Sequence, residues 1–158
     1  MALELSQDIL DQIHSYGEAA YPEEGAGFLL GRANGERRQV MALLELANAR
    51  EDAARHNRYL LTAQDYLQGE AEADRLGLDV LGVFHSHPDH PNRPSEFDRE
   101  WAMPWFSYVI TSVQAGHVIE SRSWRLAEDR SSFVEETILI ESGESRVARS
   151  NYSPFPTL

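Results

Sequence analysis

Two histidines one residue apart, His85 and His87, stand out among the side chains that could do chemistry. They lie in the segment VFHSHPDHPNRPSEFD, residues 83–98, which also carries Ser95 and Asp98. On a β-strand, residues i and i+2 point to the same face, so both imidazoles can reach one metal ion. Two nitrogens and one carboxylate oxygen suit zinc, and three protein ligands leave a fourth position open, as in catalytic zinc sites. We therefore predict a zinc site formed by His85, His87 and Asp98.

Three prolines, Pro88, Pro91 and Pro94, shape the connection between the histidines and the carboxylate. Pro88 biases the residue before it toward an extended conformation. The other two stiffen the return and lower the entropy cost of bringing Asp98 back. His90 is a rival ligand, but its position among the prolines predicts exposure to solvent. A His-x-His pair alone is weak evidence for a metal, so the prediction depends on the added acid, hydroxyl and stiff loop.

A zinc hydrolase also needs a base that takes a proton from water and passes it to the leaving group. Near the histidines, the carboxylates of Glu96 and Glu100 fall on a short exposed helix. Glu24 is more distant in sequence, but it stands directly before the small-residue segment GAGFLLG, where it could border the sheet. Spacing alone favours the plainer interpretation that Glu23 and Glu24 are a solvated acidic pair.

Composition excludes several classes of protein. The chain has 158 residues and no cysteine, which fits one domain without disulfides, thiolate zinc sites or a cysteine nucleophile. A net charge of −12 argues against nucleic-acid binding. The N-terminus does not resemble a signal peptide, and no segment approaches the roughly 20 apolar residues of a membrane span. We expect a cytoplasmic protein that does not bind membranes.

Hydrophobic periodicity, helix caps and turn residues predict an α/β fold with a mixed, mostly antiparallel sheet flanked by helices. Ser6, Thr62 and Ser95 are the expected helix caps, Gly77 is an expected helix end, and Asn34-Gly35 is an expected hairpin turn. The expected helices are 6–20, 61–77 and 95–102, and the expected strands are 26–31, 39–47, 78–87, 105–113, 117–126 and 133–141. Residues 1–140 are predicted to form the domain and residues 141–158 a polar tail.

Two separated motifs carry a family resemblance. The segment EGAGFLLG, residues 24–31, followed by His-Ser-His-Pro-x6-Ser-x-x-Asp, resembles the JAMM (MPN-plus) metalloprotease motif, most closely that of the compact bacterial branch. Similarity continues through residues 59–88, SYVITSV and SWRL, and covers roughly residues 5–126. The resemblance implies the JAMM/MPN fold, which has a cytidine-deaminase-like architecture.

Position by position, the resemblance implies a complete site: zinc ligands His85, His87 and Asp98, catalytic glutamate Glu24, and an oxyanion-stabilising serine, Ser95. Glu24 fits because the family glutamate is followed by two small residues and a glycine, and Glu23 is out of register. Many relatives have cysteine where this chain has Ala26, which we interpret as a packing position. In the implied mechanism, zinc-bound water is the nucleophile and Glu24 the general base.

The family implies hydrolysis of the peptide or isopeptide bond after the C-terminal Gly-Gly of a ubiquitin-like protein, in bacteria a small sulfur-carrier protein. The loop of residues 47–58 is a candidate border of the substrate groove. Two alternatives stay open, a non-catalytic MPN-type scaffold and a small-molecule zinc amidase. A nucleobase deaminase or a thermolysin-type protease would require Pro-Cys-x-x-Cys or His-Glu-x-x-His, and both motifs are absent. The sequence leaves the oligomeric state open.

Overall fold

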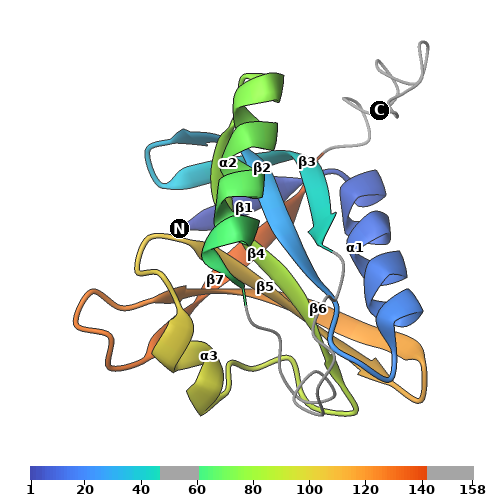
Figure 1. Ribbon diagram of the computed structural model, residues 1–158. Coiled ribbons are helices and arrows are strands. Elements are labelled where there is room, and N and C mark those ends of the chain that lie inside the picture. The colour runs from blue at the N-terminus through green and yellow to red at the C-terminus, as the bar shows by residue number, and fades with distance from the viewer. Residues whose placement is uncertain (47–60, 142–158) are drawn as a thin grey trace.

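A computed structural model describes residues 1–46 and 61–141 of the protein (Figure 1). The elements in this part of the chain follow in the order β1 (Ala2–Leu5), α1 (Gln7–Ala20), β2 (Ala26–Asn34), β3 (Arg37–Leu46), α2 (Ala63–Leu76), β4 (Asp79–Pro88), α3 (Glu96–Trp101), β5 (Ser107–Gln114), β6 (His117–Leu126) and β7 (Phe133–Ile140). Each predicted helix and strand has its counterpart here. The short strand β1 was not predicted.

The strands form one mixed sheet that closes into a barrel in the order β1-β3-β2-β4-β5-β6-β7. Four neighbouring pairs are antiparallel, and β1·β3, β1·β7 and β4·β5 are parallel. The predicted mixed, mostly antiparallel sheet flanked by helices is therefore confirmed. Its closure was not predicted, because β1 has four residues and both of its partners are distant in sequence, which leaves no hairpin signal.

Both faces of the central strands are buried. In β2, Leu29 belongs to an apolar cluster that includes Ile13 of α1, whereas the preceding residue, Phe28, belongs to a second cluster that includes Ala73 of α2. This alternation follows from the two-residue period of a strand. β4 is buried from Val80 to Pro88, so the strand that carries the histidines is enclosed on both sides.

The three helices begin at the predicted caps. The side-chain oxygens of Ser6, Thr62 and Ser95 each accept a hydrogen bond, 3.1 Å long, from the backbone N–H three residues further on. In α2 and α3 the bond is reciprocated, which forms a capping box. α2 ends, as predicted, at Gly77, whose left-handed backbone lets its N–H cap the helix.

The β2–β3 hairpin turns one residue later than predicted. The turn residues are Gly35 and Glu36, whereas Asn34 still pairs with Arg37 in the ladder. Gly35 has a φ of 66°, a conformation that glycine adopts without steric cost. The hairpin therefore places glycine at the first of the two turn positions instead of the second.

Two predicted segments lie outside the described residues: the loop of residues 47–58, which includes the candidate border of the substrate groove, and the polar tail from residue 142 onward. Glu141 is described, and its backbone N–H donates to the carbonyl of Leu5 at 2.9 Å. None of the helices in residues 1–46 and 61–141 combines the length and the apolar character that crossing a bilayer requires.

Candidate active site

The C-terminal end of β4 presents both histidines on one face. The side chains of His85 and His87 are buried, and their ring centroids lie 5.0 Å apart. The residues that alternate with them, Phe84 and Ser86, take the other face, where Phe84 joins the apolar cluster under α1. The predicted same-face arrangement of the two imidazoles is thus present.

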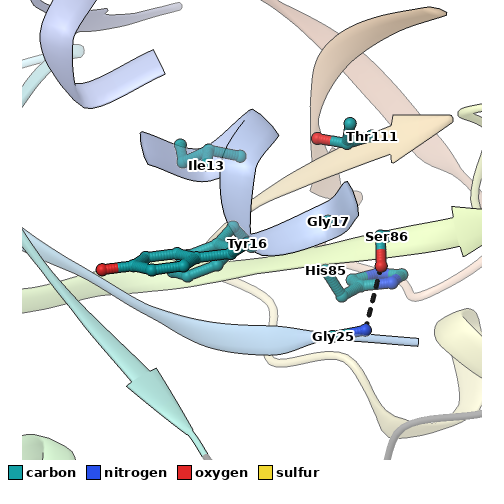
Figure 2. Close-up of a pocket in the computed structure, with 8 residues that line it drawn as sticks. Ile13, Tyr16, Gly17, Gly25, His85, Ser86 and Thr111 are labelled. Atoms are coloured by element: carbon teal, nitrogen blue, oxygen red, sulfur yellow. Dashed lines mark hydrogen bonds between the residues drawn. The ribbon is translucent and has the colours of Figure 1, made fainter. Parts of the chain in front are cut away.

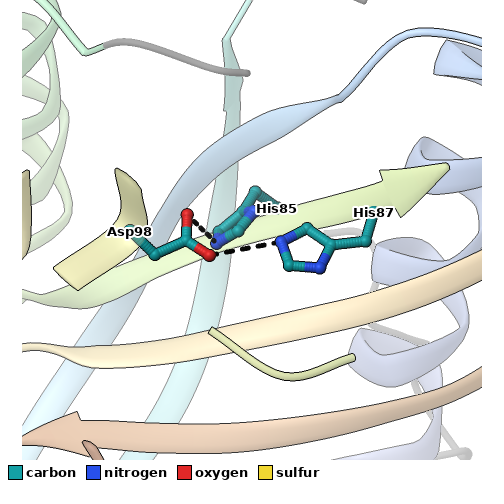
Figure 3. Close-up of side chains that lie close together, drawn as sticks. All are labelled: His85, His87 and Asp98. Atoms are coloured by element: carbon teal, nitrogen blue, oxygen red, sulfur yellow. Dashed lines mark ion pairs between the residues drawn. The ribbon is translucent and has the colours of Figure 1, made fainter. Parts of the chain in front are cut away.

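The short helix α3 delivers the third side chain. Asp98 N–H donates to Ser95 Oγ at 3.1 Å, and Ser95 N–H donates to Asp98 Oδ2 at 2.7 Å. At the other end of the helix, the Arg130 guanidinium donates to three main-chain carbonyls at 3.0, 3.1 and 3.2 Å. Both ends of α3 are therefore held, and Asp98, only 5% exposed, faces the histidines (Figure 3).

The three side chains lie at distances that suit a shared metal ion. Asp98 Oδ1 is 3.7 Å from His85 Nε2, and Asp98 Oδ2 is 3.3 Å from His87 Nε2. One ligand atom from each residue lies within 4.8 Å of the other two. Metal–ligand bonds of about 2.0–2.2 Å at tetrahedral angles place ligand atoms about 3.3 Å apart. Donor types and spacing therefore fit a metal, and no other such group occurs in the described residues.

The protonation of His85 and Asp98 also suits a metal. Burial lowers the pKa of His85 to about 3, so its imidazole is neutral. Burial works to lower the pKa of His87 as well, but the hydrogen bond and charge of Asp98 outweigh it and raise that pKa. For Asp98 burial acts upward, yet the two histidines and the Ser95 amide lower its pKa to about 2. A neutral His85 and an ionised Asp98 are the forms that bind metals.

A backbone contact sets the tautomer of His87. Its Nδ1 lies 2.8 Å from the carbonyl oxygen of Pro91. Because a carbonyl oxygen only accepts, Nδ1 carries the proton and donates it. In the neutral ring, Nε2, the nitrogen beside Asp98, is then left with a lone pair for a metal.

Glu24 lies at the entry to β2, the strand that pairs with β4. In the antiparallel pairing of β2 with β4, Ala26 is opposite His85, and the backbone N–H of Ser86 donates to Gly25. The ladder ends at this pair, and its register, continued past Gly25, would bring Glu24 opposite His87. Burial, Asp98 and the hydrogen bond to Pro91 have the larger effects on the pKa of His87, and the charge of Glu24, a residue that is 7% exposed, also raises it. Glu24 is therefore a buried carboxylate beside the donor set.

The family model for prokaryotic homologs of the JAB domain matches residues 6–127. The chain belongs to this family. The resemblance to JAMM/MPN proteins is thereby confirmed over almost the same range that the sequence predicted.

Three proteins similar to this JAB-family chain differ widely in sequence identity to it. A probable TtuB-protein conjugate cleaving protease of Thermus thermophilus is 26% identical over 118 residues, which span 73% of this chain and 75% of the relative. A solution structure from Salinibacter ruber is 45% identical, with a TM-score of 0.70 and coverage of 96% of this chain and 95% of that one. A JAB1/MPN domain protein from Archaeoglobus fulgidus, 18% identical, shares the fold with a TM-score of 0.52 and coverage of 87% and 96%.

In this JAB-family chain, Ser95 lies at the N-terminus of α3, next to the donor set. Its side chain is exposed, and its oxygen is already used to accept the Asp98 N–H. Within the described residues, nothing accepts the proton of its hydroxyl. The hydroxyl of Ser95 can therefore cap the helix and donate to a substrate at the same time.

Further residues, which sequence reasoning missed, hold the loop between the ligands. The Ser112 hydroxyl donates to the His90 carbonyl at 2.7 Å, and the Trp124 indole N–H donates to the Asn92 carbonyl at 3.0 Å. The Asn92 amide donates in turn to a main-chain carbonyl of β6 at 3.2 Å. The His90 side chain is exposed, as predicted. The one sequence signal was Trp124, because the indole N–H of a partly buried tryptophan usually has an acceptor.

Proposed function

We propose that this protein is a zinc-dependent peptidase or isopeptidase that hydrolyses the bond after the C-terminal Gly-Gly of a ubiquitin-like or sulfur-carrier protein. The observation that carries the proposal is a buried carboxylate, Glu24, whose charge acts on His87, together with a buried donor set of two histidines and Asp98. The name of the Thermus relative, a protein-conjugate cleaving protease, supports a protein substrate.

His85, His87 and Asp98 would hold the zinc through one nitrogen each and a carboxylate oxygen. When bound there, zinc supplies Lewis acidity that lowers the pKa of water toward about 7 and polarises the scissile carbonyl. The His87–Pro91 bond and the α3 capping box orient two of the three ligands in advance. The protein's own contribution is thus a preformed, largely dry donor set.

Glu24 is the proposed general base. It takes one proton from the attacking water as the new C–O bond forms, and it returns that proton to the leaving nitrogen as the C–N bond breaks. A buried carboxylate next to His87 can do both without competition from bulk water. This assignment requires the carboxylate to stay on the histidine side of β2.

Ser95 is the proposed oxyanion donor. Ser95 is exposed and bonds Asp98, so a substrate carbonyl could reach its hydroxyl beside the donor set. A donor at this position strengthens its bond as negative charge develops on the carbonyl oxygen, which lowers the barrier selectively in the transition state.

The buried carboxylate of Asp98, which lies beside the buried imidazoles of His85 and His87, argues against a non-catalytic scaffold. Removing these groups from water costs free energy that a pure binding module need not expend. Strongly shifted pKa values, such as those of His85 and Asp98, are also concentrated at functional sites. We therefore propose catalysis rather than scaffolding.

The test is a cleavage assay read by mass spectrometry. Zinc-loaded protein is mixed with each purified small ubiquitin-like protein of its own genome that has residues beyond Gly-Gly, or with a conjugate of such a carrier. The Glu24→Gln variant, isosteric but not basic, is the matched control. We expect cleavage after Gly-Gly by the wild type and a loss of about 10²–10⁴-fold in the variant.

Equal cleavage by wild type and Glu24→Gln would overturn Glu24 as the base. Intact carriers throughout the panel, with zinc bound, would overturn the proposed substrate class. Small acyl-amides tested in parallel would then identify a small-molecule amidase.

A further inference from the structure

Ser86 lies between the two histidines in sequence, but it faces α1, on the other side of β4 (Figure 2). Its side chain is 3% exposed. Ser86 Oγ accepts a hydrogen bond from the Gly25 N–H at 2.9 Å, and the Ser86 N–H donates to the Gly25 carbonyl at 3.0 Å. One residue of β4 therefore binds both main-chain polar groups of the residue that follows Glu24.

Helix α1 packs closely over this pair of bonds. A Cβ atom added to Gly17 would lie 3.4 Å from the Ser86 Cβ, and one added to Gly25 would lie only 2.9 Å from the Cβ of Ala20. The side chains around Ser86 leave no room for a water molecule. In this packed setting, the Ser86 hydroxyl is the group that satisfies the Gly25 N–H.

The two bonds between Ser86 and Gly25 lie just beyond the end of the β2–β4 ladder, next to Glu24. The β2–β4 ladder ends at the pair of Ala26 with His85, and Glu24 lies beyond it, in the connection from α1. The two bonds between Ser86 and Gly25 extend the pairing by one residue past that end. They therefore hold the main chain next to Glu24 against the strand that carries the histidines.

We propose that Ser86 is a positioning residue for Glu24, and this inference rests on the proposed role of Glu24 as general base. β4 then has two functions on opposite faces: His85 and His87 bind the metal on one, and Ser86 fixes the base through Gly25 on the other. A base displaced by about 1 Å can lose on the order of 10²-fold in rate. Ser86 thus acts on turnover without touching substrate or metal.

The Ser86→Ala variant tests this assignment in a double-mutant cycle with Glu24→Gln. The substrate is a purified carrier protein with residues beyond its Gly-Gly. Ser86→Ala alone should lower kcat by about 10- to 100-fold, with KM and zinc affinity changed less than about twofold. In the Glu24→Gln background, the same substitution should change the residual rate less than about twofold, because the base is already gone.

Ser121→Ala is the matched control. Its hydroxyl also bonds between α1 and the sheet, to His14 and Thr111 at 3.0 and 2.6 Å, but it bonds neither Ser86 nor Gly25. This variant should keep the wild-type kcat. If Ser86→Ala keeps the wild-type kcat, or lowers the rate equally in both backgrounds, the positioning role is wrong and Ser86 is only a structural residue.

A second measurement does not depend on activity. Amide hydrogen exchange of Gly25, followed by ¹⁵N NMR, should be faster in Ser86→Ala than in the wild type by on the order of tenfold. Unchanged exchange overturns the inference even if cleavage is observed. If the wild type cleaves no carrier, the proposed function fails. Faster exchange of the Gly25 amide in Ser86→Ala would still show that Ser86 holds the main chain at Gly25.

Discussion

Ser95 combines two roles that a substitution series can separate. Its oxygen caps α3 through the Asp98 N–H, and its hydroxyl proton is the proposed donor to the oxyanion. Ser95→Ala removes both. Ser95→Gly removes the hydroxyl at a smaller cost to the cap, and Ser95→Thr keeps a capping hydroxyl at this exposed position.

The magnitudes follow from the structure of α3. Loss of a serine cap to alanine costs about 1 kcal/mol, whereas loss to glycine costs only a few tenths. Because Asp98 lies three residues after the cap in a six-residue helix, we assign the full cost to metal binding. About 1 kcal/mol then corresponds to about fivefold weaker zinc affinity in Ser95→Ala, and to less than about twofold in Ser95→Gly.

Turnover should follow a different order. Loss of one oxyanion donor costs about 10²–10³ in kcat, so the Ala and Gly variants should both fall by this factor when saturated with zinc. The Thr variant should retain most of its activity. Zinc affinity is measured by competition with a chromogenic chelator, and kcat by mass spectrometry of the carrier. Wild-type turnover in Ser95→Gly would refute the donor role and leave Ser95 as a cap alone.

Three further predictions concern the supports of the site and the stability of the fold. Arg130→Met removes three hydrogen bonds to the C-terminal end of α3, so it should lower Tm by several degrees and weaken zinc binding. Unchanged zinc affinity would show that the position of Asp98 does not depend on Arg130. Burial, partly offset by the charges of Asp11 and Glu18, lowers the pKa of His14 in the folded protein. The unfolded chain therefore binds more protons, and folding stability is lost as the pH falls through about 6.5. In His14→Gln the decrease of Tm from pH 7.5 to pH 5.5 should be smaller than in the wild type, and an equal decrease would contradict this. Zinc at 100 times its Kd should stabilise the metal-free protein by about 2.7 kcal/mol in a thermal melt, and an equal stabilisation of Asp98→Asn would place the metal elsewhere.

The sequence predicted the local elements of the site because their signals are local. The alternation of His85 and His87 on an apolar strand and the cap at Ser95 were both read within a few residues, and the structure contains both. Glu24 was different. From spacing alone it resembled a solvated acid, since its burial depends on a strand pairing with residues about 60 positions away. Only the family resemblance singled it out.

The missed features share a non-local origin. The anchors of the loop, Ser112 and Trp124, bond residues 22 and 32 positions earlier in the chain, and no local period encodes such contacts. Strand β1 was missed because its two buried residues, Leu3 and Leu5, are too few for a strand pattern. What closes the barrel is therefore tertiary pairing, which overrides weak local preference.

The pairing of β1 with β7, the last described strand, also determines when the barrel can close during synthesis. Ala2 pairs with Thr137, so β1 must wait for almost the whole described chain to leave the ribosome before it finds its second partner. Glu24, the histidines and Asp98 all emerge earlier than β7. A nascent or truncated chain that lacks β7 would hold every residue of the candidate site, yet expose the edges of β1 and β6, where unpaired backbone invites aggregation.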